Sequence, residues 1–202
     1  MCPTSKAFRA QNGTAEEQLA RVIRVAQQLG SPVARVVLGT WEDRLTPGGI
    51  GRHIDSLVGV LKGGRSRALD AGVKIAVENH AGDMRAEELA AVVEMAGRDF
   101  VGVNYDSGNS LWTLENPLDA LETLAPYIVT TSLRDGVVTE IPTGCRVKWT
   151  AMGDGQIDFA RFMPRFAELC PGVPIHIETI SGVGRDIPFL EDQFWTAWPR
   201  LE

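Results

Sequence analysis

Apolar positions recur along the chain with two different periods. In residues 14–30, TAEEQLARVIRVAQQLG, they are three or four residues apart, with Thr14 and Glu17 at capping-box spacing and Gly30 at the end, which predicts an amphipathic helix. Between segments of this kind lie short apolar runs rich in β-branched residues, and these predict strands. Six such runs occur, at 34–39, 73–80, 100–109, 127–135, 147–155 and 173–179.

The segments between the strands predict further helices. One covers about 50–71, and Asp83 is placed to cap another that ends near Ala96. Asn116 and Pro117 stand in cap and first-turn positions. Asp158 precedes a helix at 159–170 with a proline inside it, and the last helix is expected within 187–201. Alternation of this kind favours one α/β domain over 1–202, with parallel strands and helices outside.

Acidic side chains end three of the predicted strands. Because side chains alternate across a strand, Glu78 and His80 share a face of 73–80, Asp106 lies on the less apolar face of the next strand, and His176 and Glu178 share a face of 173–179. Parallel α/β folds place their sites at these carboxyl ends. Converging carboxylates need compensation, and a divalent metal is the simplest form of it. The alternative is that each acid caps a helix or pairs with a lysine or arginine, and that each histidine is a hydrogen-bonded interior residue.

Charge and composition narrow the class of partner. The net charge is −6, and no run of lysine and arginine stands out, which argues against nucleic acid or an anionic membrane. No apolar stretch approaches the roughly 18 residues of a membrane span, and the first residues lack a signal core. Three widely spaced cysteines suggest reduced thiols. A cytoplasmic protein is expected.

An ordered set of short motifs resembles a known superfamily. VENH, YDSGN, LRD, MGDGQIDF and IHIET are similar, in this order, to the xylose isomerase-like TIM barrels, which include sugar (phosphate) isomerases and epimerases and the endonuclease IV (AP endonuclease family 2) relatives. The resemblance covers roughly 30–190 and implies a TIM (β/α)8-type barrel. A complete barrel takes about 250 residues, whereas this chain has 202. The first two βα units are therefore expected to be absent, with 34–39 at a sheet edge and the chain N-terminally incomplete.

The resemblance also implies a metal site. Sugar epimerases of this kind bind Mn, Mg or Co through Glu, Asp, His and Glu. Three of these positions match Glu78, Asp106 and Glu178, but the histidine position falls on Ser132, in SLRD. A serine hydroxyl is a poorer ligand than imidazole, so metal affinity should be reduced. The oxygen-rich set should favour Mg²⁺ or Mn²⁺ over zinc, and Ser132→His should raise affinity for Mn²⁺ or Co²⁺.

The implied function is metal-assisted isomerisation or epimerisation of a small sugar or polyol through an enediolate. Glu78 and Glu178 would transfer the protons, and a homo-oligomer is possible for such a chain. Substrate-binding candidates are His80, Asn109, Trp112, Arg134 and His176. Arg134 has an alternative as a structural partner of Asp135 or another acid. A non-catalytic sugar-binding or structural relative is the main alternative function. An endonuclease IV-like nuclease fits less well, because its zinc cluster needs many histidines and the chain has three.

Overall fold

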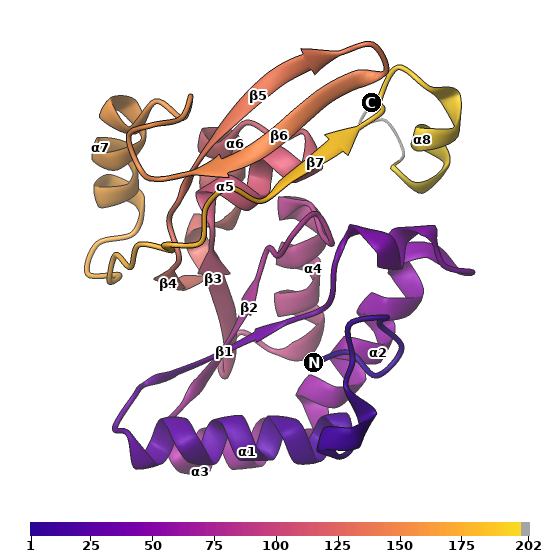
Figure 1. The fold of residues 1–202 in the computed structure, drawn as a ribbon. Helices are drawn as coiled ribbons and strands as arrows, with labels where there is room; N and C mark the ends of the chain where they lie inside the picture. The colour runs from indigo at the N-terminus through magenta and orange to yellow at the C-terminus, as the bar shows by residue number, and fades with distance from the viewer. Residues whose placement is uncertain (199–202) are drawn as a thin grey trace.

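Four parallel strands form the main sheet, in the order β1-β2-β3-β4. The computed structural model describes residues 1–198. The strands are β1 (Val33–Val37), β2 (Lys74–Glu78), β3 (Val101–Tyr105) and β4 (Ile128–Thr131). They match four of the predicted strands, and β1 lies at the sheet edge, as expected for an open barrel. Figure 1 shows β1 to β4 side by side.

Helices alternate with the strands as the periodicity predicted, but the segment 50–71 forms two helices separated at Gly64. They are α1 (Ala15–Gln28), α2 (Gly49–Gly63), α3 (Arg65–Ala71), α4 (Ala86–Ala96), α5 (Ser107–Ser110), α6 (Pro117–Leu124), α7 (Phe159–Leu169) and α8 (Asp192–Ala197). The caps predicted at Thr14, Asn116 and Asp158 are all confirmed by side-chain hydrogen bonds to backbone N–H groups of the first turn.

The predicted cap at Asp83 is wrong. Helix α4 has Arg85 at its N-cap, and the Asp83 carboxylate accepts hydrogen bonds from the backbone N–H groups of Gly39, His80 and Met84 instead. Asp83 is fully buried. It therefore ties the loop after β1 to the loop after β2 at the carboxyl end of the sheet.

The predicted strand at 147–155 belongs to a separate antiparallel sheet. A hairpin of β5 (Asp135–Ile141) and β6 (Gly144–Thr150) pairs with β7 (Gly184–Ile187). Val147 and Trp149 are buried while Arg146 and Lys148 are exposed, the alternation of an antiparallel sheet with one solvated face. This alternation and the short Pro142–Thr143 turn explain why the segment folds back on itself and does not add a parallel strand. The last helix begins later than predicted, at Asp192, because Ile187 belongs to β7 and the chain turns at residues 188–191. The predicted end of that helix lies outside the described residues.

The sixth predicted strand, 173–179, follows β4 without becoming a regular strand. Leu133 and Ile177 form a single parallel bridge. The Leu133 N–H donates to the His176 carbonyl at 2.8 Å, and the Glu178 N–H donates to the Leu133 carbonyl at 2.9 Å. The segment thus lies where the alternating pattern predicted it, on the β4 side of the sheet, and it brings Glu178 to the carboxyl end.

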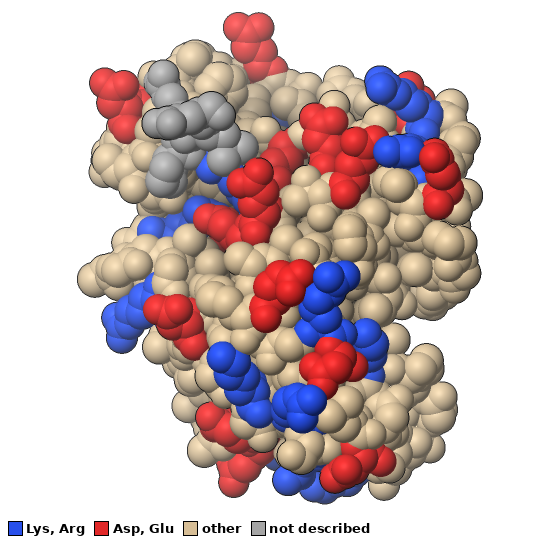
Figure 2. Space-filling view, turned by 180° about the vertical axis from the view of Figure 1, so that it is seen from behind, with Lys and Arg blue, Asp and Glu red and all other residues tan. Residues whose placement is uncertain are grey.

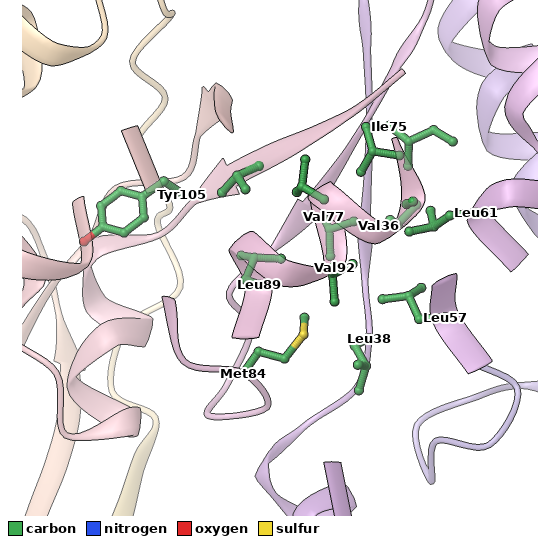
Figure 3. Packing of buried hydrophobic residues seen from close by; sticks show 14 of the residues in the cluster. Val36, Leu38, Leu57, Leu61, Ile75, Val77, Met84, Leu89, Val92 and Tyr105 are labelled. Carbon is green, nitrogen blue, oxygen red and sulfur yellow. The ribbon is translucent and has the colours of Figure 1, made fainter. Parts of the chain in front are cut away.

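The core lies between the main sheet and its helices. Val36, Ile75 and Val77 face Leu57 and Leu61 of α2, together with Leu89 and Val92 of α4 (Figure 3). A second cluster joins the loops after β1 to β3 to the β5–β7 sheet and α8, through Ala81, Trp112, Val147, Trp149, Ile187, Phe194 and Trp198. The carboxyl end of the main sheet therefore lies between two apolar clusters.

The surface is of mixed charge on the face shown in Figure 2, where lysine and arginine side chains lie beside aspartate and glutamate side chains. Within residues 1–198, no helix is both long and apolar enough to cross a membrane.

Candidate functional site

The predicted acidic residues lie at the carboxyl end of the main sheet. Glu78 is the last residue of β2, Asp106 directly follows β3, and Glu178 lies on the segment beside β4. Asn79, next to Glu78, donates to the Asp106 carbonyl at 2.9 Å and accepts from the Asp106 N–H at 2.8 Å. The ends of β2 and β3 are thereby fixed to each other.

Glu78 has no exposed surface, and three side chains donate hydrogen bonds to its carboxylate. The amides of Asn104 and Asn109 donate to its two oxygens at 3.1 and 3.2 Å, and Arg35 of β1 forms an ion pair with it. The Arg35 side chain is 44% exposed, so it covers Glu78 on the open side of the site. Arg35 and Asn104 were not among the site residues predicted from the sequence. Arg35 could have been found as a charged residue inside a predicted apolar strand, on the face opposite Ala34 and Val36.

Asp106 and Glu178 are linked through Arg134. The Arg134 Nε and Nη2 atoms lie 2.8 and 2.5 Å from Asp106 Oδ2, and Nη2 lies 3.8 Å from Glu178 Oε2. The backbone N–H groups of Gly108 and Asn109 donate to Asp106 Oδ1 at 2.9 and 3.2 Å. Burial raises the pKa of Asp106 to about 7, while the Arg134 guanidinium and these hydrogen bonds act in the opposite direction.

The alternative pairing of Arg134 with Asp135 is wrong, although pairing with another acid is what the structure shows. Asp135 accepts hydrogen bonds from the backbone N–H groups of Gly136, Gly153, Gly155 and Ile157. Its role is to hold the MGDG turn against the start of β5. Arg134 is left to face the acids of the site.

Ser132 also belongs to this network. The Asn104 amide, which donates to Glu78, also lies 3.1 Å from Ser132 Oγ. One network therefore joins six of the predicted site residues, directly or through Asn104, Arg35 and the helix that follows β3. These residues are Glu78, Asp106, Ser132, Asn109, Arg134 and Glu178. The Asn109 Oδ1 atom is buried and has no hydrogen-bond partner in the described part of the chain.

The two predicted histidines lie at the edges of the network. His80 is partly buried, and its Nδ1 lies 2.7 Å from the Gly39 carbonyl. Burial lowers the pKa of His80, against the opposing effects of this hydrogen bond and of Glu78. His176 is exposed, and its Nδ1 lies 3.2 Å from Thr130 Oγ1. Neither imidazole contacts the three acids, and so neither replaces the missing histidine of the family pattern.

Trp112 belongs to the apolar cluster that joins the loops of the main sheet to the β5–β7 sheet. Its ring stacks on Trp149 of β6, with centroids 4.5 Å apart. It also lines a cavity of about 310 Å³ at the loops after β1, β2 and β3, with Lys6, Ala7, Arg9, Thr40, Trp41, Glu42 and Ala81. A separate cavity of about 380 Å³ between α6, α7 and β5 contains none of the predicted site residues.

The donor set does not fit a divalent ion. The oxygens of Glu78 and Asp106 face guanidinium and amide groups, and the position that a histidine would hold carries Ser132, bonded to Asn104. Over residues 1–198, no three side chains of His, Cys, Asp or Glu are grouped as metal ligands would be. The expected Mn, Mg or Co ion thus has no set of donors that are free to hold it.

Comparison with known proteins agrees with the fold. Residues 2–193 match the model of the xylose isomerase-like TIM barrel family. The uncharacterized protein YihM of Escherichia coli (strain K12) is 25% identical over 125 residues, 62% of this chain and 37% of YihM. This chain therefore spans little more than a third of that relative.

Solved structures show the same architecture. A D-tagatose 3-epimerase-like protein superposes with a TM-score of 0.69 and 23% identity, covering 88% of this chain and 66% of that protein. The IOLI protein, with a binding zinc atom, superposes with a TM-score of 0.65 and 18% identity, covering 94% and 66%. The match of residues 2–193 to the family model places this protein in the xylose isomerase-like TIM barrel family.

Proposed function

We propose that the carboxyl end of the sheet binds a small sugar or polyol and moves a proton at the carbon next to its carbonyl, as in isomerisation or epimerisation. The observation that carries this proposal is the placement of two glutamates, Glu78 and Glu178, beside two guanidinium groups at one edge of a parallel sheet. Sugar epimerases occur among the structural neighbours, which include a D-allulose 3-epimerase from Methylomonas sp..

The chemistry needs a base, an acid and a positive charge. One glutamate would take the proton from the carbon next to the carbonyl, and the electron pair left behind would form an enediolate. The guanidinium of Arg134 or Arg35 would stabilise the charge developing on its oxygen. The other glutamate would return a proton to carbon. Buried amides, including the unpaired Asn109 Oδ1, supply hydrogen-bonding groups for substrate hydroxyls.

A second candidate is binding of the same ligands without turnover. It is favoured by the complete burial of Glu78 beneath Arg35, since a base must reach its proton within hydrogen-bond distance. Turnover requires Arg35 to move aside, and its side chain is 44% exposed, against 3% for Arg134 and 19% for Glu178.

Proton exchange separates these functions. Ketopentoses, ketohexoses and their phosphate esters would be incubated with the protein in D₂O, and deuterium next to the carbonyl followed by NMR. We expect exchange with at least one sugar, reduced by about 100-fold or more in Glu78→Gln and Glu178→Gln and unchanged in Glu16→Gln, a variant on the exposed side of α1. Saturable binding without exchange would establish the second candidate, and neither binding nor exchange would refute both.

A further inference from the structure

We infer that Arg134 and Arg35 stand in place of the divalent ion, so that the carboxylates of this site are compensated by the chain itself. The arginines would compensate the carboxylates in this way whether the site turns its ligand over or only binds it.

Arg134 is held where an ion between Asp106 and Glu178 would lie. Its guanidinium bonds to Asp106 and reaches Glu178. Its side chain is 3% exposed, and the Trp149 ring covers it, with the guanidinium carbon 4.0 Å from the ring centroid. The Ser107 hydroxyl donates to the Arg134 carbonyl at 2.6 Å and accepts from its N–H at 3.2 Å. Backbone and side chain are therefore both fixed, as a residue with a defined electrostatic role requires.

Arg35 compensates the remaining acid. It reaches Glu78 from β1, the neighbouring strand, where Val37 is in register with Glu78. Three carboxylates against two guanidiniums leave one negative formal charge at the site. A divalent ion would reverse the sign of this charge and would be repelled by both guanidiniums, in a buried site where such repulsion is strong.

Ser132 fits the same arrangement. With a guanidinium between the acids, an imidazole ligand has nothing to bind, and the shorter hydroxyl instead joins Asn104. The serine at position 132 and the two arginines are then parts of one arrangement. This differs from the expectation based on the sequence, in which Ser132 only weakens a metal site and Ser132→His alone restores it.

Calorimetric titration with MnCl₂ tests the inference on five proteins: the wild type, Ser132→His, Ser132→His with Arg134→Met, Ser132→His with Arg134→Lys, and Arg146→Met. Arg146 forms an exposed ion pair with Asp186 and is the matched control for loss of an arginine. We expect Mn²⁺ to bind to the Met double variant and not detectably to Ser132→His, a difference of at least about tenfold in affinity. The Lys double variant keeps the positive charge and should not bind.

Three results would overturn the inference. The first is Mn²⁺ binding by the wild type that Asp106→Asn abolishes, and the second is Ser132→His binding as tightly as the Met double variant. The third is a folded Met double variant without affinity for Mn²⁺. If that variant does not fold, the wild type and the single Ser132→His variant still decide, because binding by either contradicts compensation by arginine and binding by neither supports it. Failure of the sugar experiment above leaves these outcomes unaffected.

Discussion

Glu78 shows at the scale of one residue how the site is stabilised. A buried carboxylate without partners would be strongly destabilising, and a buried pair is stable only when its remaining hydrogen-bonding capacity is also satisfied. Glu78 has an arginine and two asparagine amides. Each partner comes from a different segment of the chain, so the charge of Glu78 couples β1, β3 and the helix after β3.

His80 gives a test of pH dependence at the same scale. Because burial lowers its pKa below the ordinary value of 6.5, the unfolded chain takes up the proton first as the pH falls. The stability that neutral His80 contributes is therefore fully present above pH 6.5 and is lost as the pH falls toward the lowered folded-state pKa. A glutamine at this position can donate to the Gly39 carbonyl and does not titrate.

We expect the difference in unfolding free energy between the wild type and His80→Gln to change in favour of the variant between pH 7.5 and pH 5. Urea unfolding at a series of pH values measures it. His176→Gln, at an exposed position, controls for loss of an imidazole elsewhere in the site. A difference that stays constant with pH would show that His80 does not titrate differently in the folded and unfolded chain.

At the scale of elements, α1 illustrates how local sequence fixes a boundary. Thr14 Oγ1 accepts from the Glu17 N–H at 3.1 Å, and the Glu17 carboxylate accepts from the Thr14 N–H at 2.8 Å. Leu19, Ile23 and Ala26 on the buried face then pack against the core. The cap and the periodicity agree with each other, and this agreement is why the helix could be located before the structure was known.

Thr14→Ala should lower the unfolding free energy by about 1 kcal/mol, because it leaves the Glu17 N–H without its partner. Urea unfolding of the variant checks the value. Thr123→Ala, on an exposed part of α6, removes a hydroxyl that bonds only to a carbonyl of its own helix, that of Asp119, and should change stability by less than about 0.5 kcal/mol. Equal effects in the two variants would contradict a specific role of the capping box.

The parts that the sequence predicted are those with a single strong period. The four strands of the main sheet are of this kind, and their alternation also placed Glu78 and Asp106 at one edge, with Glu178 on the segment beside β4. Three helix caps were predicted from short local motifs. The hairpin β5–β6 was missed because its alternation reads equally as a short strand after an irregular segment. Arg35 was missed because its pairing with Glu78, an acid on another strand, depends on register, which no local pattern encodes.

At the scale of the whole molecule, the site lies between two layers. The β5–β7 sheet lies across the carboxyl ends of β1 to β4 (Figure 1). Trp149 of β6 connects the layers, because its ring stacks on Trp112 and covers Arg134 while its Nε1 donates to the Gly108 carbonyl at 3.4 Å. We therefore expect the second sheet to hold Arg134 and the turn after β3 in place, through Trp149.

Replacing Trp149 tests this task. Trp149→Ala should lower the unfolding free energy by about 3–5 kcal/mol through the cavity that it leaves, and Trp149→Phe should lower it by less. In both variants the amides of Gly108 and Asn109, which bond to Asp106, should exchange with D₂O faster relative to other buried amides. Trp198→Ala provides the control, because Trp198 is buried in the same apolar cluster but packs on Arg44 rather than Arg134. It should cost comparable stability without a selective effect at Gly108 and Asn109. If both tryptophan variants accelerate exchange equally at these two amides, Trp149 acts only through general stability and the second sheet does not position the site.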